Sequence, residues 1–364
     1  MFPNMALWLK MLLSAAVAFV VSLLMTPPVK LFAEKIGAID VPKDERRVHD
    51  HPIPRMGGLA IALAFLLSVL LFIPMSTPLM GMLMGSVIIA VMGAVDDIVN
   101  LNAWVKLAGQ IVAALVAIRC GVVVDAITSP FTGEAVMLGG FSVPLTIIWI
   151  VACTNAVNLI DGLDGLAVGV SAISSLTMLV VALFVSEPEI SIILAGLTGA
   201  CLGFMPYNMN PAKIFMGDVG SQFLGFVLST VSILGLFKFH AIISFLIPLL
   251  ALAVPLADTI FAFFRRIFHG QSPFHADKGH FHHRLLAMGL NQKQAVAVLY
   301  AISAVLGLVA VLLAGTTAAV RAVCIAAALV ISICVWIFVF RKNPKTQNPS
   351  NRSGSSEGSE DSSK

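Results

Sequence analysis

The chain has 364 residues, of which 59% are hydrophobic and only 11% are charged, and its formal net charge is +3. A soluble domain carries about 25% charged residues, so the composition excludes an ordinary soluble protein and predicts an integral membrane protein. Five cysteines lie in or beside apolar runs, without a Cys-x-x-Cys pair. They are expected to be packing residues rather than disulfides or metal ligands.

Apolar runs long enough to cross a membrane recur along the chain. A span needs about 20 mostly apolar residues, and the first run ends at Thr26-Pro-Pro28 without a signal-peptide cleavage pattern. We therefore predict an all-α polytopic membrane protein with about eleven transmembrane helices. The expected spans are roughly 7–25, 57–73, 79–95, 104–119, 141–157, 165–184, 190–206, 221–237, 241–263, 294–314 and 318–340. Residues 343–364 are too polar to pack and are expected to form a disordered cytoplasmic tail.

The placement of basic residues predicts the orientation. With the N-terminus outside, all but four of the 22 Lys and Arg residues fall in inside segments. Because cytoplasmic loops are rich in these residues, the C-terminus and every chemically rich loop are expected on the cytoplasmic face. Outside, the strand-like runs 122–127 and 135–138 favour a small β-hairpin.

Two adjacent carboxylates, Asp96 and Asp97, end the third apolar run. Acids oppose the dipole at a helix C-terminus, which weakens the simpler interpretation of a hydrated helix end. Close acids suit a divalent metal or a base beside it. Lys106, just inside the next run, can neutralise a phosphate at the membrane surface or only anchor its helix at the interface.

Polar residues recur at steps of three after the fifth run, as Asn155, Asn158, Asp161 and Asp164. Residues three apart lie on one face of a helix, so the spacing predicts a polar stripe at the end of a span. Ionisable groups beside apolar helices are costly and indicate function. The alternative is a solvated loop that happens to carry two acids.

A glycine-bracketed acid opens the eighth run in Phe215-Met-Gly-Asp-Val-Gly-Ser221. Gly217 and Gly220 permit close backbone approach, and helix N-termini favour phosphate. Asp218 is therefore a candidate metal ligand, or simply the N-cap of its helix.

Hydrogen-bond donors gather before the tenth run, at His280, His282, His283 and Arg284. Zinc is disfavoured because no cysteine is near and structural zinc takes four tightly spaced ligands. These donors are better suited to a pyrophosphate, because the acids elsewhere in the chain can hold the metal that bridges it. Asp258, which follows a proline within an apolar run, either faces the site or satisfies backbone groups freed by the proline.

Three features occur together: acids that can hold a metal, a basic cluster that can bind phosphates, and a cytoplasmic face next to the lipid bilayer. They predict phosphoryl transfer from a soluble nucleotide-type donor to a membrane-embedded acceptor, which depends on positioning and charge neutralisation. A secondary transporter with intramembrane acids is the alternative from another class. It is disfavoured because the chain has no clear internal repeat and nearly all the acids lie at span ends.

Five motifs in this order on one membrane face give the chain a family resemblance. They are Arg46-Arg-Val-His49 with Pro54-Arg-Met-Gly-Gly58, Asp96-Asp97, Asn155-Ala-Val-Asn-Leu-Ile-Asp-Gly-Leu-Asp-Gly165, Phe215-Met-Gly-Asp218 and His280-Phe-His-His283. Over about residues 20 to 310 the chain resembles the polyprenyl-phosphate N-acetylhexosamine-1-phosphate transferases (glycosyltransferase 4 type), closest to the WecA/TagO branch.

The resemblance implies a reaction and a setting. Undecaprenyl phosphate attacks the β-phosphorus of UDP-N-acetylglucosamine (UDP-GlcNAc), UMP leaves, and a lipid-linked sugar pyrophosphate begins teichoic acid, O-antigen or a related envelope polymer. The alternatives are another UDP-sugar or UDP-MurNAc-pentapeptide as donor. The resemblance also implies a multi-pass protein of the bacterial plasma membrane, a transmembrane catalytic domain over residues 1–342, Mg²⁺ or Mn²⁺, no nucleic-acid partner, and a homodimer as in many members.

The resemblance further implies roles for single residues. Asp96 would activate the lipid phosphate. The sequence leaves open whether it acts as a base or as a covalent nucleophile, and we favour direct attack because a phosphate is already anionic at neutral pH. The other expected catalytic residues are Asp97 and Asp218; the metal ligands are Asn158, Asp218 and Asp97; the substrate contacts are Lys106, Asn155, Asp161, Asp164, Phe215, His280, His282, His283 and Arg284.

Overall fold

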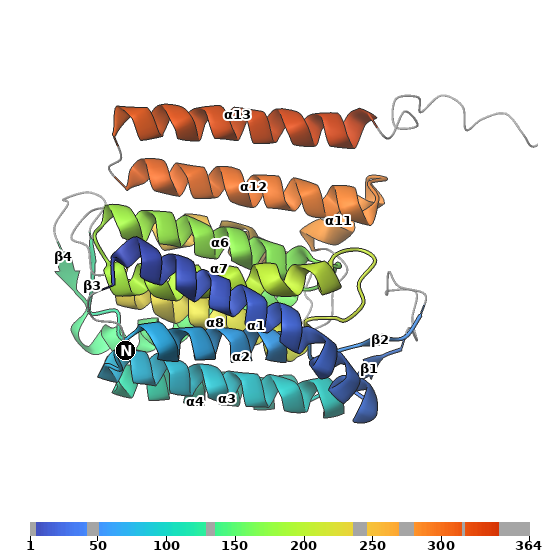
Figure 1. Ribbon diagram of the computed structural model, residues 1–364, viewed down its shortest axis with the longest axis horizontal. Helices are drawn as coiled ribbons and strands as arrows, with labels where there is room; N and C mark the ends of the chain where they lie inside the picture. The colour runs from blue at the N-terminus through green and yellow to red at the C-terminus, as the bar shows by residue number, and fades with distance from the viewer. Residues whose placement is uncertain are drawn as a thin grey trace, which may run out of the picture.

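Helices dominate the structure, a computed structural model that describes residues 5–41, 51–128, 135–235, 246–268, 280–314 and 317–341. The basic motif at residues 46–49 and the polar tail at 343–364 lie outside these ranges, so the expectations for both stay predictions. Figure 1 shows the long helices side by side, with α12 and α13 on one flank. The helices are α1 (Leu7–Lys35), α2 (Gly58–Phe72), α3 (Thr77–Val99), α4 (Ala103–Arg119), α5 (Ser142–Leu159), α6 (Leu166–Phe184), α7 (Pro188–Asn208), α8 (Gly217–Gly235), α9 (Leu246–Ala251), α10 (Ala253–Phe268), α11 (Phe281–Ala287), α12 (Gln292–Leu313) and α13 (Ala318–Arg341).

The helices confirm an all-α polytopic membrane protein. In the described part of the chain, seven helices are long and apolar enough to cross a membrane, namely α1, α3, α5 with the turn before it, α6, α7, α8 and α12. Shorter apolar helices occupy Gly58–Phe72 and Ala319–Val335. The finer prediction of about eleven spans therefore stays a prediction.

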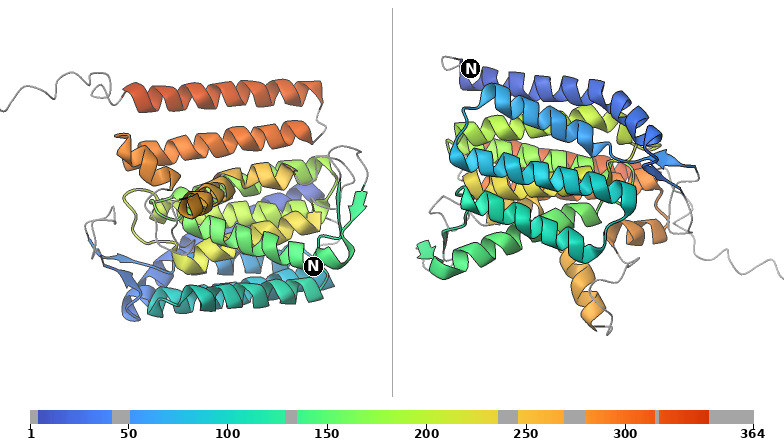
Figure 2. Two further views of the ribbon diagram at one scale, coloured as in Figure 1. Left: turned by 180° about the vertical axis from the view of Figure 1, so that it is seen from behind. Right: turned by 90° about the horizontal axis from the view of Figure 1, so that it is seen from below.

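Two expected spans differ from the structure. The first was expected to end near residue 25, yet α1 continues through Pro27 and Pro28 to Lys35, and its ribbon bends toward that end (Figure 1). The expected single span 241–263 was wrong, because α9 and α10 are separate helices. Figure 2 shows α10 projecting away from the bundle. Prolines cannot donate a backbone hydrogen bond and so bend or interrupt helices.

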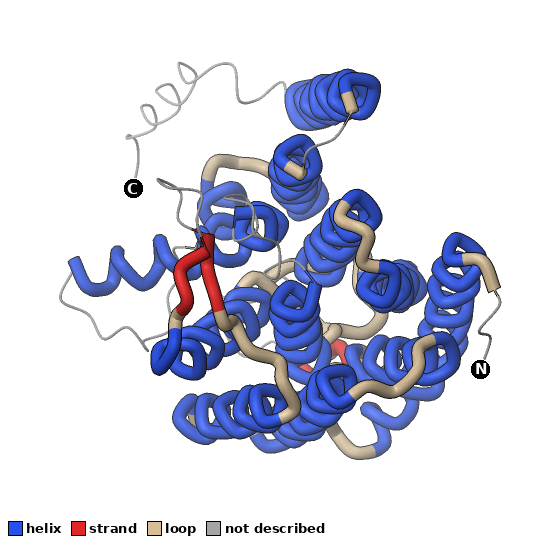
Figure 3. The backbone as a smooth tube through the Cα atoms, turned by 90° about the vertical axis from the view of Figure 1, so that its left-hand side faces the viewer, coloured by secondary structure: helices blue, strands red, loops and turns tan. Residues whose placement is uncertain are grey.

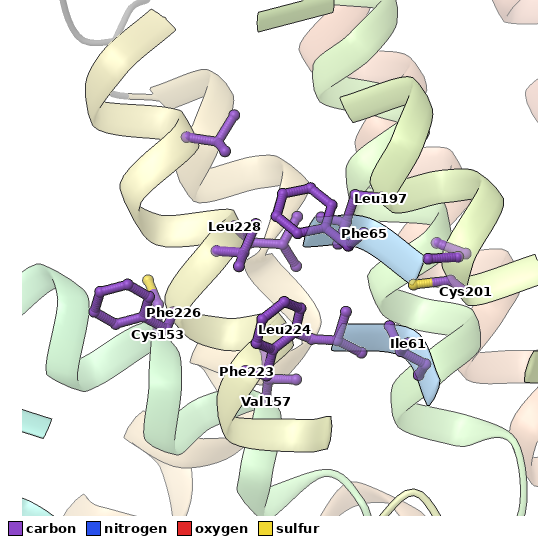
Figure 4. Close-up of a cluster of buried hydrophobic side chains, with 14 of the residues drawn as sticks. Ile61, Phe65, Cys153, Val157, Leu197, Cys201, Phe223, Leu224, Phe226 and Leu228 are labelled. Carbon is purple, nitrogen blue, oxygen red and sulfur yellow. The ribbon is translucent and has the colours of Figure 1, made fainter. Parts of the chain in front are cut away.

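Helix α8 forms the centre of the bundle. It contacts α2, α3, α5 and α6, and every side chain from Val219 to Gly235 is buried. Figure 3, which looks along the bundle, shows most of the helices end-on. Figure 4 shows α8 side chains meeting those of α2, α5 and α7, and the Phe65 and Phe223 rings meet edge to face at 5.7 Å. The burial fixes the first turn of α8 against its neighbours.

Glycines let helix backbones approach closely at the polar end of the bundle. A Cβ on Gly58 of α2 would overlap the backbone of Gly220 in α8, and a Cβ on Gly93 of α3 would overlap that of Val219. Small residues at such crossings are typical of membrane helices, where close packing replaces the hydrophobic effect. The approach places the start of α2 and the last turns of α3 beside the start of α8.

Two short hairpins lie at opposite ends of the bundle (Figure 1). Strands β3 (Ala126–Thr128) and β4 (Ala135–Met137) pair antiparallel, which confirms the predicted hairpin. Strands β1 (Ile39–Asp40) and β2 (Ile53–Pro54) also pair antiparallel and were not anticipated, because two-residue strands leave no alternating pattern. They lie between α1 and α2, at the end that carries the candidate site.

Candidate active site

A polar cavity of about 290 Å³ opens among the helix ends opposite β3 and β4. Its wall comes from segments far apart in sequence: the β1–β2 region, the end of α5 and the following turn, the loop between α7 and α8, and the starts of α8, α11 and α12. Predicted residues in the wall are Asn158, Asp161, Asp164, Phe215, Asp218 and His283. The structure thus brings together acids, an amide, an aromatic ring and an imidazole from three separate stretches of the sequence.

Lys106 joins two of the predicted acids. Its Nζ lies 2.7 Å from Asp218 Oδ2 and also forms an ion pair with Asp96 Oδ2. Asp96 accepts a second hydrogen bond, 2.6 Å long, from the backbone N–H of Leu101. The lysine is thus held inside the site instead of only anchoring its helix, and places one positive charge between two carboxylates.

Asp97 points to a different place from its neighbour. Its Oδ1 accepts from the backbone N–H of Asp218 at 2.9 Å, and its Oδ2 from that of Val219 at 3.2 Å. A carboxylate of α3 therefore caps the N-terminus of α8, a favourable position for a negative charge. Gly217, with φ of +71°, leaves the space for it, because a Cβ there would overlap the Asp97 carboxyl group.

Asp218 does not cap its own helix, because Asp97 takes that place. Its Oδ1 accepts from Asn158 Nδ2 at 3.0 Å, while the same Asn158 nitrogen donates to Ser221 Oγ at 2.8 Å. The Asp218 carboxylate, only 17% exposed, is thus oriented by contacts from α4 and α5. This arrangement favours a functional role for the side chain over simple capping.

Asn155 lies behind this cluster. Its amide exchanges hydrogen bonds with Gln110 of α4 at 2.7 and 3.3 Å, and Gln110 also donates to Gln222 of α8 at 3.0 Å. The network links three helices one turn from Asn158. Asn155 is absent from the cavity wall, so its expected substrate contact stays a prediction.

The predicted stripe is only partly helical. Helix α5 ends at Leu159, so Asp161 and Asp164 lie in the turn before α6 rather than on one helix face with Asn158. Gly165, with φ of +79°, completes the turn. Three of the four stripe residues therefore line the cavity, but the expected single helix face was wrong beyond Leu159.

The two acids of the turn have different surroundings. Burial, and then the negative charges of Asp218 and Asp97, raise the pKa of Asp161 to about 8, against the opposing effect of Arg55. Asp164 Oδ2 instead accepts from Asn210 Nδ2 at 2.9 Å and from the backbone N–H of Ala212 at 3.0 Å. It thereby ties the turn to the α7–α8 loop, which carries Phe215.

A magnesium ion fits the donor chemistry of this wall. Within the described ranges, no three His, Cys, Asp or Glu side chains form a closed metal cage. Mg²⁺ commonly takes one or two protein oxygen ligands and completes its shell with water and substrate phosphates. The Asp218 carboxylate and the Asn158 amide are neighbouring oxygen donors of this kind, at an open cavity.

The histidine block is anchored by Asp258 of α10. Asp258 Oδ2 lies 2.8 Å from His280 Nδ1, and Oδ1 accepts from the backbone N–H of Phe281 at 2.7 Å. Asp258 is 1% exposed. Asp258 therefore holds the start of α11 against α10. The positions of the other histidines in α11 depend on this anchor.

The four predicted donors of this block separate in space. The His280 and His282 rings stack at 5.8 Å, and both are buried. Burial, and then the neighbouring His283, lower the pKa of His282 to about 4. His283 reaches the cavity wall, whereas the Arg284 guanidinium lies 5.0 Å from the Phe261 ring centre and outside that wall. Substrate contacts of His280, His282 and Arg284 stay predictions.

Several wall residues were not predicted as site residues. Arg55 lines the cavity, and its Nε lies 3.8 Å from Asp97 Oδ1; its place in the Pro54–Gly58 motif was the available signal. Asp40, Asn208 and Gln292 also line it. Nothing in the local sequence around Gln292 marks it, because only the fold brings the start of α12 to Asp164.

Comparison with known proteins assigns the chain to a family. Residues 79–236 match the family described as glycosyl transferase family 4. The chain is 44% identical to a probable undecaprenyl-phosphate N-acetylglucosaminyl 1-phosphate transferase of Bacillus subtilis, over 83% of this chain and 85% of that protein. It is 31% identical to an undecaprenyl-phosphate alpha-N-acetylglucosaminyl 1-phosphate transferase of Thermotoga maritima (72% and 78% covered) and 27% identical to one of Escherichia coli K12 (77% of each). The chain therefore belongs to glycosyl transferase family 4, among the polyprenyl-phosphate N-acetylhexosamine-1-phosphate transferases of the WecA/TagO type.

Proposed function

We propose that the protein transfers N-acetylglucosamine 1-phosphate from UDP-GlcNAc to undecaprenyl phosphate and releases UMP. The observation that carries the proposal is the joining of Asp96 and Asp218 by Lys106 at the edge of an open polar cavity among membrane helix ends. The names of the relatives supply the acceptor and the transferred N-acetylglucosaminyl 1-phosphate group, and the family resemblance supplies UDP as the carrier of that group.

The reaction exchanges one phosphorus–oxygen bond for another. An oxygen of the lipid phosphate bonds to the β-phosphorus of the donor, and the bond from that phosphorus to the oxygen bridging the α-phosphorus breaks. UMP leaves with that oxygen and its electron pair, so no oxidant or further reactant is needed. The lipid phosphate is already anionic near neutral pH, which favours direct attack over a covalent aspartyl intermediate.

The main task of the site is to bring two anions together. Lys106 supplies a positive charge where the lipid phosphate would enter, and Asp96 fixes the position of the lysine. Arg55 and His283, on the cavity wall, are donors suited to the pyrophosphate. Charge neutralisation and alignment of this kind account for most of phosphoryl-transfer catalysis.

A bound Mg²⁺ would neutralise charge on the donor pyrophosphate. Asp218 and Asn158 are the residues we propose to hold it, with Asp97 acting through the first turn of α8 rather than as a direct ligand. Mn²⁺ offers similar coordination chemistry. We assign the uracil to the part of the wall formed by Phe215 and Asp164, the two residues that the family resemblance implies as uracil contacts.

We also propose that the cavity faces the cytoplasm, with the N-terminus outside and about eleven spans. The excess of Lys and Arg in the segments at the cavity end supports this orientation. UDP-sugars are soluble cytoplasmic compounds, so this side gives the donor access. A product linked to lipid would serve an envelope polymer of the teichoic acid or O-antigen type in a bacterial plasma membrane.

Transfer can be tested with purified protein, UDP-GlcNAc, undecaprenyl phosphate and Mg²⁺, scored by UMP release. Wild-type protein should release UMP only when both substrates and the metal are present, and Asp218→Ala should lose the activity. The matched control is Asp125→Ala, which removes an exposed acid at the opposite end of the bundle. No UMP from the wild type, or full activity in Asp218→Ala, contradicts the proposal. Replacement of the donor by UDP-MurNAc-pentapeptide or another UDP-sugar tests its identity.

A further inference from the structure

Gln292 begins α12 and lies on the cavity wall close to Asp164. The two residues are joined by Asn210, whose Nδ2 donates to Asp164 Oδ2 at 2.9 Å and to Gln292 Oε1 at 2.7 Å. Asn210 itself is absent from the wall. The bridge therefore runs behind two residues that both border the space for the substrate.

The bridge fixes which way the Gln292 amide faces. An ionised carboxylate only accepts hydrogen bonds, so the Asn210 amide must present its NH₂ group to Asp164. The same NH₂ group then needs an acceptor from Gln292, which turns the Gln292 oxygen toward Asn210. The Gln292 Nε2 is consequently directed away from the bridge, and no described residue accepts a hydrogen bond from it.

The wall thus offers an acceptor and a donor side by side. One Asp164 oxygen is free of the bridge, since both described hydrogen bonds to this side chain end on Oδ2. Uracil presents an N3–H donor flanked by carbonyl acceptors, which complements this pair. At the N3 and C4 positions cytosine presents the reverse, an unprotonated N3 beside an amino group, so a cytosine placed like the uracil meets both wall groups with the wrong polarity.

Resting on the proposed uridine nucleotide donor, we propose that Gln292 is a specificity-determining residue: it donates a hydrogen bond to the C4 carbonyl of uracil and, with Asp164 at N3–H, selects uridine over cytidine nucleotides. Because of Asn210, the selection depends on three separate segments, namely the turn after α5, the loop between α7 and α8, and the start of α12. A site built to hydrogen-bond its ligand rejects analogues that leave its polar groups unpaired.

The sharpest variant is Gln292→Glu. It keeps an oxygen for Asn210 but replaces the outward NH₂ group by an oxygen, so the donor becomes an acceptor. The matched control is Lys293→Gln, which changes the local charge by the same amount at the exposed neighbouring position. A second variant, Gln292→Met, removes the amide without adding charge.

UMP release by the wild type is established first, in a coupled assay that keeps the UMP concentration low. The inhibition constants of UMP and of CMP are then measured for the wild type and for each variant. The ratio of the two inhibition constants should shift toward CMP by roughly tenfold or more in Gln292→Glu, the effect of one inverted hydrogen bond, and stay at the wild-type value in Lys293→Gln. Gln292→Met should raise KM for UDP-GlcNAc about tenfold with kcat nearly unchanged, because the contact is the same in ground and transition states.

An unchanged UMP-to-CMP ratio in Gln292→Glu, or a ratio that shifts equally in Lys293→Gln, overturns the inference. If Gln292→Glu does not fold, an unchanged KM in Gln292→Met overturns it instead. Absence of transfer by the wild type would contradict the proposed function and is a separate result, since it is scored before any variant is compared.

Discussion

Replacing Asp97 by asparagine should destabilise the protein as well as inactivate it. The Asp97 carboxylate accepts two hydrogen bonds from backbone N–H groups at the start of α8, at 2.9 and 3.2 Å. Asparagine keeps the shape but offers one acceptor oxygen. Its NH₂ group would then face one of the two N–H donors, and the negative charge at the helix N-terminus would be lost.

The size of the effect follows from these two contacts. Hydrogen bonds to charged groups contribute about 1.5–3 kcal/mol, and a buried group left unpaired costs about 1–3 kcal/mol. We expect Asp97→Asn to lower the free energy of unfolding by about 3 kcal/mol, since one bond weakens and the other is replaced by a donor facing a donor. A shift of α8 by about 1 Å would also misplace Asp218 and reduce kcat roughly a hundredfold.

The assay compares the thermal unfolding midpoint in detergent, followed by fluorescence of the four tryptophans, with the rate of UMP release. Asp218→Asn is the matched control. It removes a carboxylate from the same site but leaves the backbone contacts to Asp97, so it should abolish transfer with a much smaller change in midpoint. A wild-type midpoint in inactive Asp97→Asn would refute the capping argument and assign Asp97 to the chemistry alone.

Three further outcomes are expected. Gly217→Ala should lower both midpoint and activity, because a Cβ at its positive φ would overlap the Asp97 carboxyl group; Gly140→Ala, with nothing near the added Cβ, should change neither. Asp258→Ala should lower the midpoint and raise KM for the donor, since it leaves His280 and α11 unanchored; an unchanged KM would contradict the anchoring. Burial lowers the pKa of His282 from its ordinary value of 6.5 to about 4, so between these pH values the unfolded chain binds more protons than the folded one. The free energy of unfolding should therefore fall as the pH is lowered from about 6.5 to 4, and level off below. The unfolding midpoints measured at pH 7 and pH 5 should differ less in His282→Asn than in the wild type.

Sequence reasoning identified several residues that line the candidate site but not the contacts among them. Polar residues at the ends of apolar runs have few structural explanations, so Asp96, Asn158 and Asp218 could be identified from pattern alone. Contacts between distant helices leave no such pattern. The Asp258 anchor of the histidine block and the place of Gln292 beside Asp164 depend on how α10, α11 and α12 pack, and neither residue carries a local signal for it.

The positions of the apolar helices could be predicted from the sequence, but their bends and breaks could not. Hydropathy identifies apolar segments but not their direction, which is why the single span expected over 241–263 became α9 and a projecting α10. The continuation of α1 through Pro27 and Pro28 similarly reflects packing that overrides a local helix breaker. A regular spacing of three predicted one helical face, whereas the helix ends at Leu159, and Asn158, Asp161 and Asp164 line the cavity from the helix end and the following turn.

The adjacent carboxylates of α3 explain how a site can be built from acids in an unfavourable place. Both lie at a helix C-terminus, where the dipole disfavours negative charge, and neighbours on a helix point about 100° apart. The divergence lets each acid find a different compensating group: Lys106 for Asp96, and the positive N-terminus of α8 for Asp97. Because Asp218 is the second residue of α8 and also binds Lys106, the two compensations close a loop through α3, α4 and α8. A displacement of any one of these helix ends must therefore move the other two, which couples the stability of the bundle to the alignment of the reacting phosphates.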